Sequence, residues 1–114
     1  MRLEQIRDLL DARLLAGQCD LEAEVTHAFA ADLMSDVLAL AGPGTLLLTG
    51  LTNPQVVRTS EVAGVTAIVF VRGKHALPET EELAREAGIP LFRTDLKMFD
   101  ACGRLYQAGL RGTV

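Results

Sequence analysis

The first sixteen residues change from a helical to an extended hydrophobic pattern. Leu3, Ile6 and Leu9 recur at three-residue spacing between charged and amide side chains. This spacing predicts an amphipathic helix over residues 2–11. Residues 12–16 form a short, largely apolar stretch without helical spacing, so we expect a strand there.

A second strand and helix are expected before residue 45. Residues 25–30 form a short stretch with β-branched and aromatic side chains, which is typical of a strand. Asp32 stands where it can cap the helix that follows. The apolar face of that helix is expected to comprise Leu33, Val37, Leu40 and Ala41.

The second half of the chain alternates between apolar runs and amphipathic segments. Residues 45–49 and 65–71 are continuous apolar runs, the pattern of strands that are buried on both faces. Asn53 and Pro54 provide a cap and a first turn for a helix between these strands. We expect a further strand over residues 89–92 and helices that end at Gly64, Gly88 and Gly109, the last of them spanning residues 97–108.

This alternation predicts an α/β fold with a mainly parallel sheet and helices on both faces, in three layers. Residues 13–30 are expected to add edge strands. Residues 89–92 should also lie nearer an edge, because Pro90 has no N–H to donate to a neighbouring strand. We expect one domain over residues 1–110, followed by a frayed tail of residues 111–114.

Composition and charge exclude several classes of function. The 114 residues carry 11 Lys and Arg against 15 Asp and Glu, a net charge of −4, whereas nucleic-acid binding needs a basic face. No apolar run approaches the roughly 20 residues of a membrane span, and the N-terminus lacks the pattern of a signal peptide. A cytoplasmic location is therefore the expectation.

Cys19 and Cys102 are interpreted as two reduced thiols, and we expect neither a metal site nor a cofactor.

Candidate binding residues fall where predicted parallel strands end, the edge at which ligands bind in such sheets. Asn53 begins a helix whose free N–H groups attract anions, and Arg72 and Lys74 follow the next strand. The alternative is that these are ordinary capping residues and solvated loop charges, as are His75 and Asp95. The proposed ligand site comprises Asn53, Arg72, Gly73, Lys74 and Thr94.

Asp32 and Asp36 are four residues apart, so we expect them on one helix face. Such a pair can hold a cation, meet an arginine across an interface, or do neither. Two stretches offer apolar surface for an interface, although helical apolar positions are more often core. They are residues 33–37 and the last helix with Met98, Phe99, Cys102 and Tyr106.

Several catalytic motifs are absent from the sequence. It contains no Gly-x-x-x-x-Gly-Lys-Ser/Thr loop, no Gly-x-Gly-x-x-Gly fingerprint and no Gly-x-Ser-x-Gly elbow. The chain therefore looks like a binding or interaction module rather than a complete enzyme. We do not expect it to be a kinase, because it lacks the phosphate-binding loop.

The chain resembles the DRTGG-domain family of small α/β modules. The resemblance extends over nearly the whole chain and is carried by residues 31–38, 46–57, 67–74 and 102–106. The family is named for an Asp-Arg pair after one strand and Thr-Gly-Gly after the next. Here the first position reads Gly-Leu-Thr-Asn over residues 50–53, and the second, residues 71–74, keeps only Gly73. Both changes fall in the loops selected above as the candidate site.

The resemblance implies a three-layer fold similar to the N-terminal domain of HPr kinase/phosphorylase. It also implies a regulatory and dimerising role, because fused members accompany CBS domains, acyl-phosphate transferases or pyrophosphatases. No catalytic residue is established for the family.

Three functional hypotheses follow. The first is a non-catalytic regulatory module that forms a homodimer and contacts a partner protein. The second is a sensor of a nucleotide or another phosphorylated metabolite, bound at the ligand site defined above. The third and weakest is a phosphate-ester enzyme that uses Asp32 or Asp36, for which the sequence supplies no partnered nucleophile.

Overall fold

The computed structural model describes residues 1–16 and 19–113 and confirms the predicted order of helices and strands. The first half consists of α1 (Leu3–Leu10), β1 (Arg13–Ala16), β2 (His27–Ala30) and α2 (Met34–Leu40). The second half consists of β3 (Thr45–Thr49), α3 (Pro54–Ala63), β4 (Ala67–Phe70), α4 (Pro78–Ala87), β5 (Leu91–Arg93) and α5 (Met98–Gln107). No helix in the described residues is both long enough and apolar enough to cross a membrane.

The five strands form one sheet in the order β1-β5-β4-β3-β2. Strands β2 to β5 are parallel, with Leu46 opposite Ala67 and Ile68 opposite Leu91, and β1 pairs antiparallel with β5. β1 and β2 are the edge strands, as predicted.

β5 lies nearer an edge than β4 does, as expected, but it is not the edge strand, because β1 covers its outer side. Pro90 directly precedes the first paired residue, Leu91, so its missing N–H costs the ladder nothing. The Pro90 carbonyl still accepts a hydrogen bond from the Ile68 N–H at 3.0 Å.

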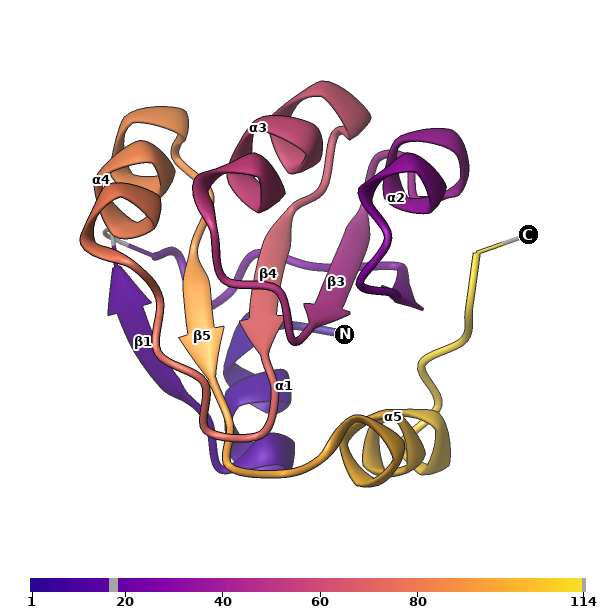
Figure 1. Ribbon diagram of the computed structural model, residues 1–114. Helices are drawn as coiled ribbons and strands as arrows, with labels where there is room; N and C mark the ends of the chain where they lie inside the picture. Colours follow the sequence, from indigo (N-terminus) through magenta and orange to yellow (C-terminus); the bar gives the residue numbers. More distant parts are fainter. Residues whose placement is uncertain (17–18, 114) are drawn as a thin grey trace.

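Helices cover both faces of the sheet, which gives the predicted three layers (Figure 1). α2, α3 and α4 lie side by side on one face, because the crossovers β2-α2-β3, β3-α3-β4 and β4-α4-β5 all return on that side. α1 and α5 share the other face. One face therefore carries three helices and the other carries two.

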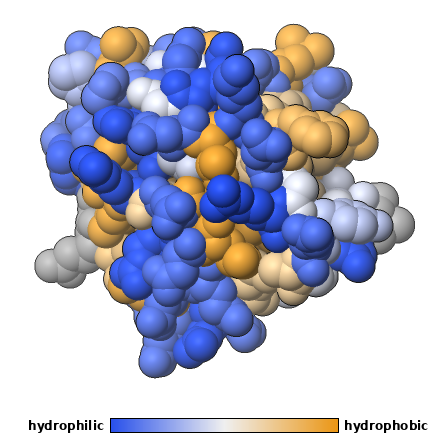
Figure 2. All heavy atoms as spheres, turned by 90° about the horizontal axis from the view of Figure 1, so that it is seen from below, coloured by the Kyte–Doolittle hydropathy of each residue, from blue (hydrophilic) through white to orange (hydrophobic). Residues whose placement is uncertain are grey.

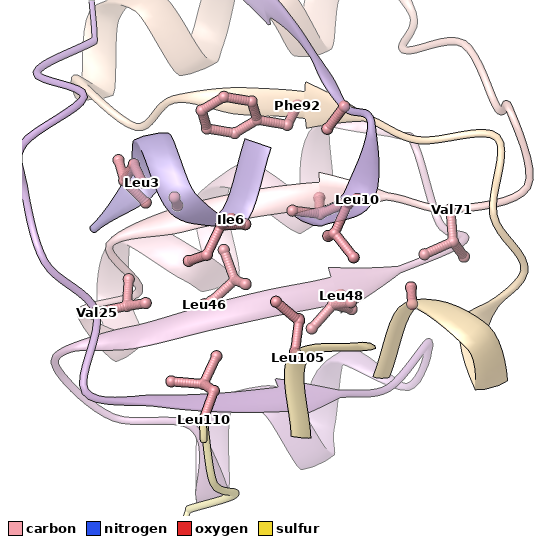
Figure 3. Packing of buried hydrophobic residues seen from close by; sticks show 14 residues of the cluster. Leu3, Ile6, Leu10, Val25, Leu46, Leu48, Val71, Phe92, Leu105 and Leu110 are labelled. Carbon is pink, nitrogen blue, oxygen red and sulfur yellow. The ribbon is translucent and has the colours of Figure 1, made fainter. Parts of the chain in front are cut away.

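Two hydrophobic clusters hold the layers together, one on each face of the sheet. In β3, Leu46 and Leu48 face α1 and α5, whereas Leu47 faces the three-helix layer, as the alternation of side chains along a strand requires. All five residues of β3 are buried, which confirms the prediction from its continuous apolar run. Figure 3 shows Leu3, Ile6 and Leu10 of α1 directed toward the sheet.

Residues 111–113 do not fray as predicted. The Ala28 N–H donates to the Arg111 carbonyl at 2.9 Å, and Gly112 forms a parallel bridge with Ala28. The reason is that β2 is an edge strand whose outward N–H groups need a partner. Val114 lies outside the described residues.

Cys19 and Cys102 are free thiols, as expected, and both are partly buried. Burial raises the pKa of each thiol, and for Cys19 the neighbouring Asp20 carboxylate raises it further while Arg7 lowers it. Neither thiol is therefore poised as a nucleophile near neutral pH.

Candidate functional site

The carboxyl ends of β2, β3, β4 and β5 meet at one edge of the sheet, because these strands are parallel. Figure 2 looks onto this edge, which is mostly hydrophilic with a band of hydrophobic side chains across its middle. Each loop that leaves this edge contributes one of the stretches selected from the sequence.

Asp32 follows β2 and reaches across to the end of β3. Its Oδ1 accepts hydrogen bonds from the Thr49 hydroxyl at 2.9 Å and from the Gly50 N–H at 2.7 Å. Asp32 therefore does not cap α2, whose N-cap residue is Leu33. The prediction that Asp32 would cap the helix is wrong because the adjacent strand offers two donors that lie close to its carboxylate.

Asp36 lies in the first turn of α2, and its side chain is exposed. Asp32 precedes the helix, so the two carboxylates do not share a helix face as expected. Within the described residues, no group of three or more His, Cys, Asp or Glu side chains is placed to hold a metal ion.

Asn53 caps α3 as predicted. Its Oδ1 accepts a hydrogen bond from the Gln55 N–H at 3.0 Å, and Pro54 occupies the first turn. The Thr52 carbonyl just before it accepts from the Thr80 hydroxyl at 2.7 Å, which ties the start of α3 to α4. A ligand at this point would meet backbone N–H groups of the first turn rather than the Asn53 side chain.

Arg72 and Gly73 form the middle of a tight turn after β4. Both have positive φ, 62° and 64°, and the Lys74 N–H donates to the Val71 carbonyl at 3.3 Å. The Arg72 N–H donates to Leu96 and the Gly73 N–H to Thr94, both at 2.8 Å, so the turn is bonded to the loop after β5.

This turn directs the Arg72 guanidinium over Gly50, in the neighbouring loop. A Cβ at Gly50 would lie 2.6 Å from Nη2 of Arg72, a distance that only glycine permits without displacing the guanidinium. Arg72 and Lys74 are both exposed and form no ion pair with any described residue. Two cations are therefore free at this edge, and one of them lies against the end of β3.

Thr94 is buried, and its hydroxyl is fully engaged within the fold. It donates to the Leu10 carbonyl at 2.7 Å and accepts from the Leu96 N–H at 3.2 Å. Thr94 therefore holds the end of α1 against β5, and its place in a ligand site stays a prediction.

The charges next to Thr94 neutralise one another. Arg93 donates to Nδ1 of His75 at 3.1 Å and lies 3.6 Å from Oδ1 of Asp95. Asp95 does not cap α5, whose N-cap residue is Lys97. This cluster was not expected from the sequence, because His75 and Arg93 are 18 residues apart and only the pairing of β4 with β5 brings them together.

The apolar surface is divided between α2 and α5. Val37 is fully buried, whereas Leu33, Leu38 and Leu40 are 62%, 54% and 58% exposed. On α5, Phe99 is 86% exposed and Tyr106 is 61% exposed. Met98 and Cys102 pack against the core instead.

One solved structure resembles this chain over nearly its whole length. It contains the CBS and DRTGG domains of the regulatory region of Clostridium perfringens pyrophosphatase, complexed with the activator diadenosine tetraphosphate. The TM-score is 0.79 at 18% sequence identity, over 94% of this chain and 46% of that one. The chain has a DRTGG-like fold.

At this level of identity the likeness concerns the DRTGG-like fold alone, and the chain spans about half the length of the protein it matches. No protein-family model matches the sequence, and no curated protein is significantly similar to it. The matched domains belong to the regulatory region of that pyrophosphatase.

Proposed function

We propose that this chain is a non-catalytic regulatory module that forms a homodimer through α2 and contacts a partner protein. The observation that carries the proposal is the apolar surface of α2. Leu33 and Leu40 are exposed on one flank of the buried Val37, and Leu38 is exposed on the other. The apolar arc of α2 is therefore wider than the surface that its own domain covers, which is typical of an interface.

The position and charge of α2 favour a second copy of the chain as the occupant. α2 packs over the β2 end of the sheet, with α3 as its neighbour on one side only. Asp36 is the only charged residue between Met34 and Leu40, so two copies of the helix meet with little charge repulsion. The DRTGG-like fold supports a regulatory role, because the similar structure is a regulatory region.

Light scattering across a dilution series tests the homodimer. We expect a mass of twice the 12.3 kDa monomer at about 100 µM. Leu38→Glu and Leu40→Glu introduce a charge on opposite flanks of α2, and at least one should yield the monomer. Phe99→Glu, an equal change at an exposed site in the other layer, should leave the dimer intact. A wild-type monomer at this concentration would contradict the proposal.

The contact with a partner protein is assigned to α5, where Phe99 and Tyr106 are exposed on the opposite layer. A pull-down tests this assignment. We expect the wild-type chain and the monomeric α2 variant to retain a partner protein, and Phe99→Glu to lose it. Equal retention by the wild-type chain and both variants would place the contact elsewhere.

A second function, sensing of a nucleotide or another phosphorylated metabolite, is favoured by Arg72. Its guanidinium lies over Gly50, carries no ion pair with a described residue, and has Lys74 two residues away. Guanidinium and ammonium groups bind phosphate oxygens, and the start of α3 offers backbone N–H groups at the same edge. The similar structure was determined with a nucleotide activator, which makes nucleotides the first probes.

Calorimetric titration with ATP and with diadenosine tetraphosphate tests this second function. We expect the double variant Arg72→Gln/Lys74→Gln to bind at least about tenfold more weakly than the wild type. Arg58→Gln removes an exposed charge from α3 and serves as the matched control. If the double variant binds as tightly as this control, the phosphate site lies elsewhere.

A further inference from the structure

A hollow of about 180 Å³ opens between the β2 end of the sheet and α5. It lies on the face of the sheet that α1 and α5 cover, beside the edge strand β2. Ala28 and Ala30 line the hollow from β2 with methyl groups. Leu48 and Leu105, which lie next to each other in Figure 3, line it from β3 and α5. Its lining includes Ala28, Ala30, Leu48, Leu105, Tyr106 and Arg111.

Arg111 is fixed at the rim of this hollow. Its Nη1 donates to the Tyr106 carbonyl at 2.8 Å and to the Leu110 carbonyl at 3.2 Å. Its guanidinium carbon lies 3.9 Å from the centroid of the Tyr106 ring. These contacts hold the cation in place before any ligand arrives, which lowers the entropy lost on binding.

The Arg111 guanidinium has hydrogen-bond donors that the fold does not use. No Asp or Glu of the described residues forms an ion pair with Arg111, and its Nε and Nη2 donate no hydrogen bond within that part of the chain. A carboxylate can accept from these remaining donors while the guanidinium keeps its contacts with the carbonyls and the ring. The rim is therefore complementary to an anion, and the interior is complementary to hydrocarbon.

We propose that this hollow is a ligand site for a small carboxylic acid with an apolar ring or branched chain. An apolar protein cavity of about 150 Å³ admits benzene, so the volume here suits one ring with its substituent at the opening. The carboxylate lies against Arg111, and the ring lies between Ala30 of β2 and Leu105 of α5. This site lies on a face of the sheet, shares no residue with the ligand site predicted from the sequence, and does not depend on the function proposed above.

Titration with benzoate, followed by amide NMR of the full chain, tests the site. We expect saturable shifts at Ala28, Ala30 and Leu105, with a Kd of about 1 mM for so small a ligand. Benzyl alcohol has the same ring without the charge and should bind at least about threefold more weakly than benzoate. Benzoate should likewise bind at least about threefold more weakly to Arg111→Gln than to the wild type. Equal binding of the two compounds, or no saturable shift, would overturn the proposal.

Ala30→Leu fills the hollow from β2 and should abolish binding of benzoate, whereas Ala39→Leu, an equal change at an exposed position of α2, should leave it unchanged. A second readout uses the wild-type chain. Cys102 lines the hollow, so saturating benzoate should slow its alkylation by iodoacetamide, while Cys19 provides an internal reference. An unchanged rate at Cys102 relative to Cys19 would also overturn the proposal.

Discussion

Arg72 holds a backbone conformation that residues with a Cβ avoid. Its φ of 62° lies in the left-handed region, which costs an L-residue about 1–2 kcal/mol relative to the right-handed region. Such strain persists where the surroundings determine it, and here hydrogen bonds from Arg72 and Gly73 to the loop after β5 fix the turn. This conformation places the Arg72 guanidinium over Gly50. With the usual negative φ at Arg72, the side chain would point in another direction.

Replacing Arg72 with glycine should therefore separate stability from ligand binding. We expect Arg72→Gly to match the wild type or to exceed it by up to about 1 kcal/mol in the free energy of unfolding, because glycine adopts positive φ without strain. Urea denaturation measures this difference, and binding of nucleotide should fall in the same variant. A loss of more than about 1 kcal/mol would show that the Arg72 side chain stabilises the fold.

The pose of Arg72 could not be predicted from the sequence. Gly73 indicated a turn, but the positive φ of Arg72 and its approach to Gly50 depend on the pairing of β3 with β4. Asn53 is the opposite case. Its cap was predictable because the donor that it serves, the Gln55 N–H, lies two residues away. Local partners can be inferred from spacing, whereas partners on another strand require the fold.

At the scale of elements, Thr94 shows how α1 is attached to the sheet. Its hydroxyl joins the Leu10 carbonyl, at the end of α1, to the Leu96 N–H, in the loop after β5. Thr94 is only 1% exposed, so no water can replace these partners.

Thr94→Val keeps the shape of the side chain and removes both hydrogen bonds. We expect the free energy of unfolding to fall by about 1–3 kcal/mol, because the buried Leu10 carbonyl and the partly buried Leu96 N–H lose their partner. Thr94→Ser retains the hydroxyl and should cost less. Thermal or urea denaturation of the two variants measures the difference, and equal losses in both would indicate that packing of the methyl group matters more than the hydrogen bonds.

The elements of the second half were predictable for a physical reason. β3 and β4 are buried on both faces and read as continuous apolar runs, and proline and glycine mark the ends of α3 and α4. Pro90 indicated that β5 lies near an edge, but it does not reveal that β1 returns to cover the outer side of β5. Asp32 was misassigned for a similar reason, since its donors lie at the end of β3, 17 and 18 residues away.

At the scale of the whole molecule, the two thiols link stability to pH. Burial raises the pKa of Cys19 and Cys102 in the folded chain above the usual thiol value of about 8.5. The folded state therefore holds these protons more tightly than the unfolded state does. The stabilisation is fully present below about pH 8.5 and is lost as the pH rises through the folded pKa values.

Urea denaturation at several pH values between about 7.5 and 10 tests this linkage. We expect the free energy of unfolding to decrease over this range, and the decrease should be smaller in Cys19→Ser/Cys102→Ala, which cannot release these protons. The comparison between the two chains removes the contribution of lysine and tyrosine, which are common to both. Parallel pH profiles would show that the thiols do not contribute.

The sheet order also determines when each part of the chain can fold during synthesis. β1 pairs only with β5, and the hydrogen bond from Thr94 to Leu10 joins residues that are 84 positions apart. The ribosome makes β1 before β5, and β5 is among the last of these strands to emerge. α1 can already pack on β3 and β4, but β1 has no strand to pair with until β5 is made, so its backbone N–H and C=O groups stay open to a chaperone for that time.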